Sequence, residues 1–358
     1  MKETKRYSRQ VALAEIGESG QQKIQNARVL VIGAGGLGCP VLQNLAAAGV
    51  GIIGIVDGDV VEETNLHRQL LYTSIDCGKN KAITAATAIQ KLNPDVSVQV
   101  FSDFFTLENA FEIVEDYEII VDCTDTITVR YLINDVSLVK KIPFVYASIH
   151  KFEGQVSVFN YKNGPSYRCL FPEKENLNSV PSCAEAGVLG VLPNILGVFQ
   201  ATEVLKIILE IGTVLSGKLL IYEGLQVQTQ LIDFHKNPKE IEKGKINRLQ
   251  LMNLKKNTFN AVVSYEQFLE KSNDSSILII DVREENEKPE FLGQNIVNVP
   301  LNNLESYTKP LDKNQEILLF CQTGQRSLMA LHYLKKQGFN HISHLKRGIQ
   351  NLEQLINN

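Results

Sequence analysis

The glycine-rich stretch at residues 33–38 constrains the fold of this chain more than any other feature of the sequence. It reads Gly33-Ala34-Gly35-Gly36-Leu37-Gly38 and lies between the apolar run Val29–Ile32 and an alanine-rich stretch of helical character. Glycines in this pattern permit a tight turn after a buried strand and let the backbone approach a phosphate, while the N-terminus of the next helix favours an anion. Asp57 ends the next predicted strand, 19 residues after Gly38, where a carboxylate binds ribose hydroxyls. Together these features predict a Rossmann-like, nucleotide-binding α/β domain.

Apolar strand-like runs alternate with helical stretches from Arg28 to about Ile232. The predicted strands are Arg28–Ile32, Gly51–Asp57, Val96–Phe101, Ile119–Asp122, Pro143–Ala147, Gln155–Phe159, Lys218–Tyr222 and Gln228–Asp233. The predicted helices include Pro40–Ala48, Lys79–Leu92, Thr126–Lys140 and Leu192–Glu210. The early alternation predicts parallel strands with crossover helices, and the closer spacing of the later strands predicts antiparallel pairing. The expected sheet is therefore mixed and largely parallel.

A second, smaller α/β pattern occupies the C-terminal part of the chain, as a length of 358 residues favours two domains. We expect a nucleotide-binding domain at residues 1–235, a charged linker at 236–257 and a second domain at 258–358. The second domain is predicted to contain the strands Ile277–Asp281, Ile296–Val299, Glu316–Phe320 and Ile342–Leu345, the helix Ser327–Gln337 and a final helix.

Composition excludes several classes of protein. The net charge of −4 argues against a nucleic-acid partner, and no run of 18 apolar residues predicts a membrane span. The N-terminal residues lack the apolar core of a signal peptide, so the expected compartment is the cytoplasm. The six cysteines are scattered without a CxxC pair, which favours packing residues or reactive thiols over a disulfide framework.

The segment after Asp57 indicates which nucleotide is bound. It brings Asn65, Arg68 and Gln69 together, and Lys81 follows where a helix opens. Two cations suit a triphosphate, which carries more charge than the pyrophosphate of a dinucleotide. Asp125 lies just past the carboxyl end of a strand, where a carboxylate can hold Mg²⁺ beside phosphates.

A second loop predicts sulfur chemistry. Cys321 follows the apolar run Ile317–Phe320 and begins a Cys-x-x-Gly-x-Arg loop that leads into a helix. Successive backbone N–H groups in such a turn bind an anion and favour a thiolate or a persulfide. The residues of this persulfide loop are Cys321, Gln322, Thr323, Gly324, Gln325 and Arg326.

Residues of about 5–235 resemble the MoeB/ThiF/HesA family, which adenylates small ubiquitin-like sulfur-carrier proteins. The motifs are Arg6–Gln10, the glycine loop, Asp57–Gln69, Gly78-x-x-Lys81, Asp122–Asp125, Gly154–Val156 and Cys183–Val188. The resemblance implies a homodimer in which Arg9 reaches the neighbouring subunit's site. It also implies that Asp57 binds ribose, that Asn65, Arg68 and Lys81 bind phosphates, and that Asp125 binds Mg²⁺. Cys183 matches a cysteine that bonds to the carrier in some relatives, with a structural role equally open.

The segment from about Thr258 to Asn358 resembles a rhodanese domain, on Asp281–Glu284 and the Cys321 loop. Two departures from the families' patterns matter. Ser166 replaces one cysteine of the usual zinc-binding pair with Cys169, and no cysteine occurs between Asp233 and Cys321, so no zinc is expected. Thr126 follows Asp125 where asparagine is usual, and Gln322 stands where many rhodanese loops have arginine.

The sequence therefore predicts an ATP- and Mg²⁺-dependent enzyme. It would adenylate the C-terminal glycine of a MoaD-like carrier and then transfer sulfur from a persulfide on Cys321, loaded by a persulfide donor, to give a thiocarboxylate. Activation of a ThiS-like carrier for thiamine synthesis is an alternative. An NAD-dependent oxidoreductase would have no use for Arg68, Lys81 or Cys321, and a non-catalytic binding module would have no use for the full set of phosphate residues.

Overall fold

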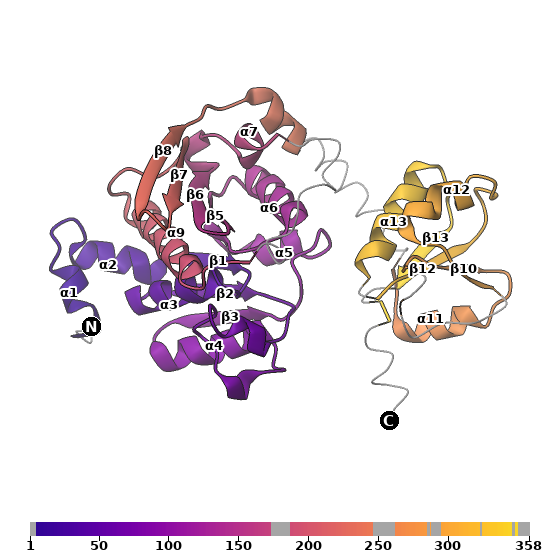
Figure 1. The fold of residues 1–358 in the computed structure, drawn as a ribbon, viewed down its shortest axis with the longest axis horizontal. Coiled ribbons are helices and arrows are strands. Elements are labelled where there is room, and N and C mark those ends of the chain that lie inside the picture. The colour runs from indigo at the N-terminus through magenta and orange to yellow at the C-terminus, as the bar shows by residue number, and fades with distance from the viewer. Residues whose placement is uncertain are drawn as a thin grey trace. The chain divides into compact units, whose positions relative to one another are not determined.

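The computed structural model describes residues 5–172, 187–245, 262–284, 287, 295–322, 324–345 and 348–349. The chain divides into two compact units, Met1–Leu251 and Met252–Asn358. This division falls inside the stretch expected to be a linker. Each unit consists of helices around its own sheet, so the predicted α/β class is confirmed for both (Figure 1).

The first unit is built on an eight-stranded sheet with the order β3-β2-β1-β4-β5-β6-β7-β8. Its strands are β1 Arg28–Ile32, β2 Ile52–Val56, β3 Ser97–Phe101, β4 Ile119–Asp122, β5 Phe144–His150, β6 Glu153–Phe159, β7 Lys218–Glu223 and β8 Gln228–Asp233. Neighbours from β3 to β5 are parallel, whereas the pairs from β5 to β8 are antiparallel. The predicted change from parallel to antiparallel pairing is confirmed.

Helices cover both faces of this sheet (Figure 1). The α-helices are α1 Ser8–Val11, α2 Gly17–Asn26, α3 Gly38–Ala48, α4 Lys81–Leu92, α5 Ala110–Val114, α6 Ile127–Lys140, α7 Tyr167–Leu170 and α9 Leu192–Leu209. Short 3-10 turns lie at Lys5–Tyr7, Glu63–Asn65, Ser74–Asp76 and Tyr161–Asn163. Alternate residues of β1 enter two cores: Val29 and Val31 pack with α3, α4 and α9, and Leu30 and Ile32 pack with α5 and α6. The central strand β1 is therefore buried on both sides.

Helix α9 is long and apolar enough to cross a membrane, judged by length and composition alone. In the first unit it packs against α3, β5 and β6, and it buries the polar residues Gln200 and Glu203. Gln200 Nε2 donates to the carbonyl oxygen of Asp122 at 2.8 Å, and the backbone N–H of Leu215 donates to Glu203 Oε2 at 2.9 Å. These are the contacts of a core helix in a globular domain.

The second unit has a five-stranded sheet with the order β11-β10-β12-β13-β9, and its pairs are parallel. The strands are β9 Val262–Val263, β10 Leu278–Asp281, β11 Ile296–Asn298, β12 Ile317–Phe320 and β13 Ile342–Leu345. The helices are α11 Tyr265–Ser272, α12 Leu304–Thr308 and α13 Gln325–Lys336, with a 3-10 turn at Leu301–Asn303. All of β12 is buried, so Cys321 follows a strand at the centre of the unit.

Several elements were not predicted. Helix α2 carries Gly17 and Gly20, which weaken a helical pattern, and the short elements α5, α7, α11, α12 and β9 offer little periodicity. Residues 238–245, within the expected linker, form a helix that buries Glu240 and Ile241 against the first unit. The expected final helix falls on residues outside the described ones.

Candidate active site

The predicted nucleotide loop and the segments that follow β2 and β4 begin at one edge of the sheet. Ile32, the last residue of β1, is in register with Val56 of β2 and with Asp122 of β4. The backbone N–H of Gly33 donates to the carbonyl oxygen of Val56 at 2.8 Å. The carboxyl ends of these parallel strands are where α/β sheets bind ligands.

The glycine loop is packed so closely that two of its glycines have no room for a side chain. Gly33 has a φ of +96°, and a Cβ there would lie 2.7 Å from the carbonyl oxygen of Cys123. A Cβ at Gly38 would lie 2.1 Å from the carbonyl oxygen of Gly33. At Gly35 the nearest atom would be Gln69 Nε2 at 3.6 Å, and at Gly36 it would be Pro193 Cβ at 3.1 Å. Gly33 and Gly38 thus close the turn, whereas Gly35 borders space that a ligand can use.

Asp57 joins the glycine loop to the segment after β2. Its Oδ2 accepts the backbone N–H of Ala34 at 2.7 Å, and its Oδ1 accepts that of Asp59 at 2.8 Å. Burial raises the pKa of the Asp57 carboxyl above its ordinary value, although these two backbone donors act in the opposite direction. The carboxylate therefore lies beside the loop, with lone pairs left for a ligand hydroxyl.

Among the described residues, Asn65 Oδ1 and Gln69 Oε1 are buried side-chain oxygens without a hydrogen-bond partner. The two residues are 7% and 4% exposed. An unpaired buried polar atom costs about 1–3 kcal/mol. The side chain of Gln69 lies next to the space at Gly35, with its Nε2 3.6 Å from the position of a Cβ there.

The two predicted phosphate cations differ in their surroundings. Lys81 is buried at the start of α4, and its Nζ lies 3.2 Å from Asp59 Oδ2. Arg68 is half-buried, and its guanidinium donates to the carbonyl oxygen of Thr64 at 2.9 Å. The stem of Arg68 passes the glycine loop, because its Cγ lies 3.6 Å from the position of a Cβ at Gly36.

Asp125 is exposed, and its Oδ1 accepts a hydrogen bond from Thr126 Oγ1 at 3.3 Å. A neighbouring network that the sequence analysis missed fixes its segment. Asp122 Oδ1 accepts from the hydroxyl of Thr124 at 2.7 Å, and Asp122 Oδ2 lies 3.7 Å from Arg130 Nε. The guanidinium of Arg130 also donates to the carbonyl oxygen of Thr124 at 2.8 Å. The sequence carries no local signal for this network, because Arg130 reaches Asp122 only through the packing of α6 on β4.

The N-terminal motif presents Arg9 to solvent. Tyr7 is buried, and its hydroxyl accepts from Asn93 Nδ2 at 2.7 Å. Gln10 Nε2 donates to Gln21 Oε1 at 2.6 Å. These anchors leave Arg9 on the exposed side of α1, which packs against α2. Within one subunit, Arg9 is not brought to the other predicted site residues.

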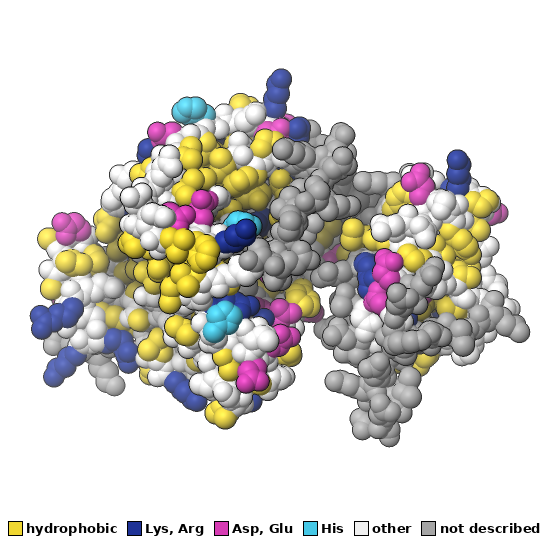
Figure 2. Space-filling model, in the orientation of Figure 1, with side chains coloured by type: hydrophobic (Ala, Val, Ile, Leu, Met, Phe, Trp, Pro, Cys, Tyr) yellow, Lys and Arg dark blue, Asp and Glu magenta, His cyan; other side chains and the backbone are white. Residues whose placement is uncertain are grey.

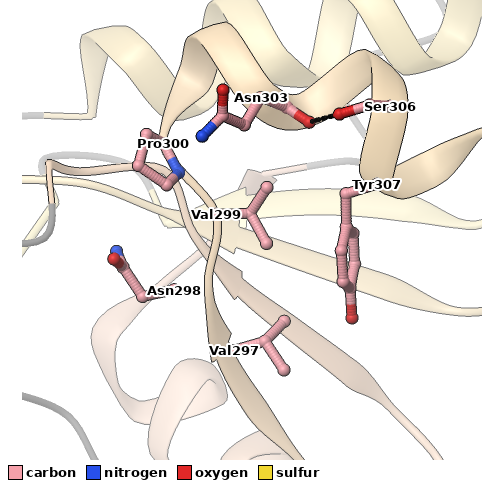
Figure 3. Close-up of a pocket in the computed structure, with 7 residues that line it drawn as sticks. All are labelled: Val297, Asn298, Val299, Pro300, Asn303, Ser306 and Tyr307. Atoms are coloured by element: carbon pink, nitrogen blue, oxygen red, sulfur yellow. Dashed lines mark hydrogen bonds between the residues drawn. The ribbon is translucent and has the colours of Figure 1, made fainter.

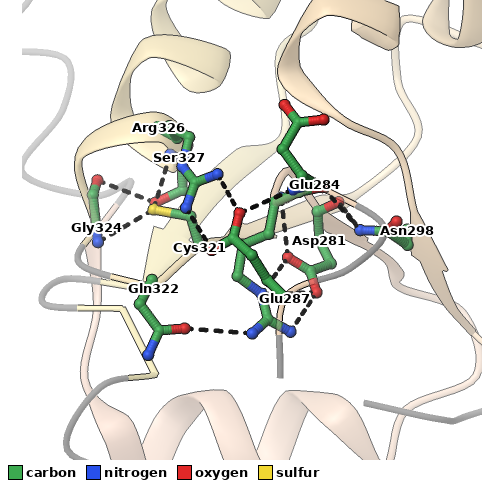
Figure 4. A network of polar contacts seen from close by, with 10 residues as sticks. Asp281, Glu284, Glu287, Asn298, Cys321, Gln322, Gly324, Arg326 and Ser327 are labelled. Carbon is green, nitrogen blue, oxygen red and sulfur yellow. Dashed lines mark hydrogen bonds and ion pairs between the residues drawn. The ribbon is translucent and has the colours of Figure 1, made fainter. Parts of the chain in front are cut away.

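In the second unit, two backbone donors point at the sulfur of Cys321 (Figure 4). The N–H of Gly324 lies 3.1 Å from Sγ, and the N–H of Ser327 lies 3.4 Å from it. Gly324 has a φ of +89° and immediately precedes α13, whose first residue is Gln325. An anionic sulfur accepts hydrogen bonds in this geometry. Thr323 lies outside the described residues.

Two charged pairs border this loop (Figure 4). Arg326 forms a bidentate ion pair with Glu287, with Nη2 donating to Oε2 at 2.8 Å. The Arg326 guanidinium lowers the pKa of the Glu287 carboxyl to about 2. Arg283 pairs with Asp281 at 2.7 Å and donates to the Gln322 side chain at 3.2 Å. Gln322 therefore joins the loop to β10, and Glu287 is a site residue that the sequence analysis missed.

The other cysteines are placed as follows. Cys39 and Cys123 are buried, and burial raises the pKa of the Cys39 thiol to about 12 and that of Cys123 well above its ordinary value. Cys77 is exposed, and Cys183 lies outside the described residues. Cys169 Sγ accepts from the backbone N–H of Asn237 at 3.2 Å. Among the residues that the structure describes, no group of three or more His, Cys, Asp or Glu side chains is placed to hold a metal ion.

A cavity of about 630 Å³ lies beside β11 (Figure 3). Its lining is Val297, Asn298, Val299, Pro300, Asn303, Ser306 and Tyr307. None of these side chains is charged, and the cavity does not include the reactive loop. We assign it no function.

Each of the two units matches a known protein family. The ThiF family model matches residues 7–243, and a rhodanese-like domain model matches residues 264–355. The chain belongs to the ThiF family. The resemblances predicted for the two parts of this ThiF-family protein are thereby confirmed.

Relatives of this ThiF-family protein share one or both parts. A sulfur carrier protein adenylyltransferase of Thermus thermophilus is 47% identical over 66% of this chain and 89% of its own length. A probable adenylyltransferase/sulfurtransferase MoeZ of Mycobacterium tuberculosis is 37% identical over 97% of this chain and 92% of its own. The adenylyltransferase and sulfurtransferase MOCS3 of Drosophila grimshawi is 36% identical over 96% of this chain and 82% of its own length.

Among solved structures, E. coli MccB with ATP is similar with a TM-score of 0.53 at 23% identity, covering 61% of this chain and 66% of that one. E. coli MccB with MccA-N7isoASN has a TM-score of 0.57 at 22% identity, covering 65% of this chain and 72% of that one. At this identity the likeness supports the Rossmann-like fold of the first unit.

Proposed function

We propose that this protein uses ATP to adenylate the C-terminal glycine of a small ubiquitin-like sulfur-carrier protein and then transfers sulfur from Cys321 to it. The observation that carries the proposal is that one chain holds both sites. The first unit has a glycine loop bordered by Asp57, Gln69 and Lys81, and the second has a cysteine sulfur that accepts two backbone N–H groups. The names of relatives that match nearly the whole chain pair the same two activities.

The residues of the first unit fit ATP as the substrate. Asp57 is placed for the ribose hydroxyls, and the space at Gly35 gives phosphates access to the loop. Asn65, Arg68, Gln69 and Lys81 supply polar and cationic groups around that space. A triphosphate carries enough charge to bind Lys81 in competition with Asp59.

In the adenylation step, a carboxylate oxygen of the carrier's terminal glycine attacks the α-phosphorus of ATP. The bond from this phosphorus to the bridging oxygen of pyrophosphate breaks, and the products are an acyl adenylate and pyrophosphate. Arg68 and Lys81 stabilise the charge that develops on the phosphates.

Asp125 is the residue proposed to hold Mg²⁺. It fits, because its carboxylate is exposed at the carboxyl end of β4, whereas Asp122 is committed to Thr124 and Arg130. Mg²⁺ needs only one or two protein carboxylates when phosphates and waters complete its shell, and it would neutralise phosphate charge there. We do not include zinc among the cofactors.

In the sulfur step, a persulfide donor first loads one sulfur atom onto Cys321. The outer sulfur of this persulfide attacks the acyl carbon of the adenylate and displaces AMP. A thiol then cleaves the S–S bond, which releases the carrier as a thiocarboxylate and leaves a disulfide between that thiol and Cys321. A reducing compartment, the cytoplasm, suits this chemistry.

We expect the protein to act as a homodimer with a carrier bound at each site. Hydrophobic side chains gather in patches on the visible face of the first unit (Figure 2). Leu231 and Ile232 on the edge strand β8, with Phe152 and Leu225, are among the exposed large hydrophobic residues. Such surfaces supply contact area for a second subunit or a carrier.

ATP–pyrophosphate exchange with purified carriers tests the first half of the proposal. A MoaD-like carrier should support exchange, and the same carrier without its terminal glycine should not. Exchange with a ThiS-like carrier alone would assign the protein to thiamine synthesis and not to molybdenum cofactor synthesis. Absence of exchange with every carrier that ends in glycine would contradict the proposal.

A further inference from the structure

A buried histidine lies behind the sulfur loop and contacts the reactive cysteine through a single hydroxyl group. His344 is on β13, next to β12, and is in register with Leu319, two residues before Cys321. Its Nδ1 lies 3.2 Å from Ser327 Oγ, and Ser327 Oγ lies 3.7 Å from Cys321 Sγ. Cys321 and Ser327 have no exposed surface, and His344 is 4% exposed. The three side chains therefore form a dry, continuous chain of polar atoms.

The Ser327 hydroxyl has one proton and three neighbours that can use it. Besides Sγ and Nδ1, its oxygen lies 3.0 Å from the carbonyl oxygen of Gly324. When Cys321 is a thiol, its S–H donates to Oγ, and the hydroxyl donates to Gly324 or to His344. When the sulfur is an anion, it accepts from the N–H groups of Gly324 and Ser327, and the hydroxyl turns toward it. Ser327 Oγ then needs a donor, and a proton on His344 Nδ1 provides one.

Most of the other charged groups around the loop form ion pairs with one another. On β10 and the loop after it, Asp281 pairs with Arg283 at 2.7 Å, and Glu284 is exposed. On α13, Arg326 pairs with Glu287 at 2.8 Å. Among the described residues, His344 is the titratable side chain that Ser327 connects to Cys321: Ser327 Oγ is hydrogen-bonded both to Cys321 Sγ and to His344 Nδ1.

We propose that His344 accepts the proton of Cys321, through the Ser327 hydroxyl, when sulfur is loaded. The Cys321 proton moves to Ser327 Oγ while the Ser327 proton moves to His344 Nδ1. The freed sulfur electron pair attacks the outer sulfur of a donor persulfide. A new S–S bond forms, the S–S bond of the donor breaks, and the donor leaves as a thiolate. Electrons balance without an added oxidant. His344 is a positioning residue, since it touches Ser327 and not the substrate, and the inference rests on the sulfur transfer proposed above.

The test is the rate of Cys321 alkylation by iodoacetamide between pH 5.5 and 9.5, followed by peptide mass spectrometry on the full-length protein. His344→Gln should shift the pH profile upward by at least about one unit, so that alkylation near pH 6.5 slows about tenfold, while the rates converge at the alkaline end. Ser327→Ala should give the same shift, and the double variant should give no more than either single one. Ser327→Thr, which keeps the hydroxyl, and His341→Gln, which changes an exposed histidine nearby, should retain the wild-type profile.

A His344→Gln profile identical to wild type would overturn the proposal, and so would a slower rate by the same factor at every pH, which indicates packing damage. If thermal melting shows that this variant is unfolded, His344→Asn and Ser327→Ala decide by the same criterion. The readout does not depend on sulfur transfer. A shifted alkylation profile in a protein that never loads sulfur from a persulfide donor would therefore refute the sulfurtransferase function and leave the proton path intact.

Discussion

Lys81 and Arg68 differ in burial and in the partners that their side chains contact in the absence of a nucleotide. Lys81 is buried beside Asp59, with Nζ 3.2 Å from Oδ2, whereas Arg68 is half-buried and donates a hydrogen bond to a backbone carbonyl. The stem of Arg68 lies beside the glycine loop, because its Cγ is 3.6 Å from the position of a Cβ at Gly36. Preorganised cations of this kind contribute more to catalysis than mobile ones, because they need no rearrangement during the reaction.

We predict that Lys81→Ala lowers carrier-dependent pyrophosphate exchange by ~10²–10³-fold, as loss of a preorganised electrostatic contact does. Arg68→Ala should act in the same direction. The matched control is Lys79→Ala, because Lys79 is two residues away but pairs with Asp76 at the surface. Wild-type exchange in both the Lys81 and Arg68 variants would contradict the nucleotide assignment, provided that circular dichroism shows both to be folded.

The Glu287–Arg326 pair predicts a pH dependence of stability. The pKa of Glu287 is lowered from 4.5 to about 2 in the folded protein. A carboxyl whose pKa is lower in the folded state than in the unfolded state stabilises the folded protein at pH values above its unfolded-state pKa. This stabilisation is lost as the pH falls through the folded-state pKa. The difference in unfolding free energy between wild type and Glu287→Gln should therefore be constant from pH 7 to about 5 and shrink from about pH 4.5 downward. Denaturant titrations at each pH measure it, and a difference that grows on acidification would refute the assignment.

The site residues that could be named from the sequence are those in short local motifs. Gly33, Asp57 and Cys321 each follow a strand with a recognisable apolar run, so their place at a strand end is implied by the chain itself. Glu287 and His344 carry no such local signal, because their partners Arg326 and Ser327 are brought to them by the fold. The Asp122–Arg130 contact depends in the same way on how α6 packs on β4.

At the scale of elements, several strands were predicted with their observed limits, and the short helices were not predicted. The predicted limits of β1, β4, β8 and β13 agree with the structure, because continuous apolar or alternating runs mark them. Helix α5 spans only Ala110–Val114, too short for a helical period to appear. The helix at residues 238–245 was missed because its contacts are tertiary: a Cβ at Gly244 would lie 2.8 Å from Asp135 Oδ1 of α6.

The junction of β1 and α3 gives a prediction at this scale. Gly38→Ala should reduce stability by about 1–3 kcal/mol, because its Cβ would lie 2.1 Å from the carbonyl oxygen of Gly33 and would push α3 away from the strand. Gly35→Ala should leave thermal melting unchanged but weaken ATP binding, because its Cβ points into the open space beside Gln69. Melting curves should show a lower melting temperature for Gly38→Ala than for Gly35→Ala, and ATP titrations should show weaker binding for Gly35→Ala than for wild type. Equal melting temperatures of the two variants would argue against the tight turn.

At the scale of the whole molecule, the position of Arg9 suggests a shared active site. The anchors at Tyr7 and Gln10 hold α1 on the first unit while Arg9 faces solvent. An arginine presented in this way is available to a neighbouring subunit.

Mixing Arg9→Ala subunits with Asp125→Ala subunits should therefore restore part of the exchange activity that each variant lacks. Some mixed dimers would combine an intact Arg9 from one subunit with an intact Asp125 from the other. The control is each variant mixed with itself under the same exchange conditions. No recovery, when tagged subunits demonstrably exchange, would count against a site completed in trans.

The central claim is that one chain activates a carrier at one site and supplies sulfur from another. Cys321→Ala tests it most directly, with Cys77→Ala as the control because Cys77 is also a free cysteine but is exposed and outside the loop. With ATP, a carrier and a persulfide donor, mass spectrometry should detect an added sulfur on Cys321 and a thiocarboxylate on the carrier for wild type and Cys77→Ala. Cys321→Ala should keep pyrophosphate exchange near the wild-type rate and form almost no thiocarboxylate. Thiocarboxylate formed at the full rate by Cys321→Ala would contradict the account and make the second unit a docking module.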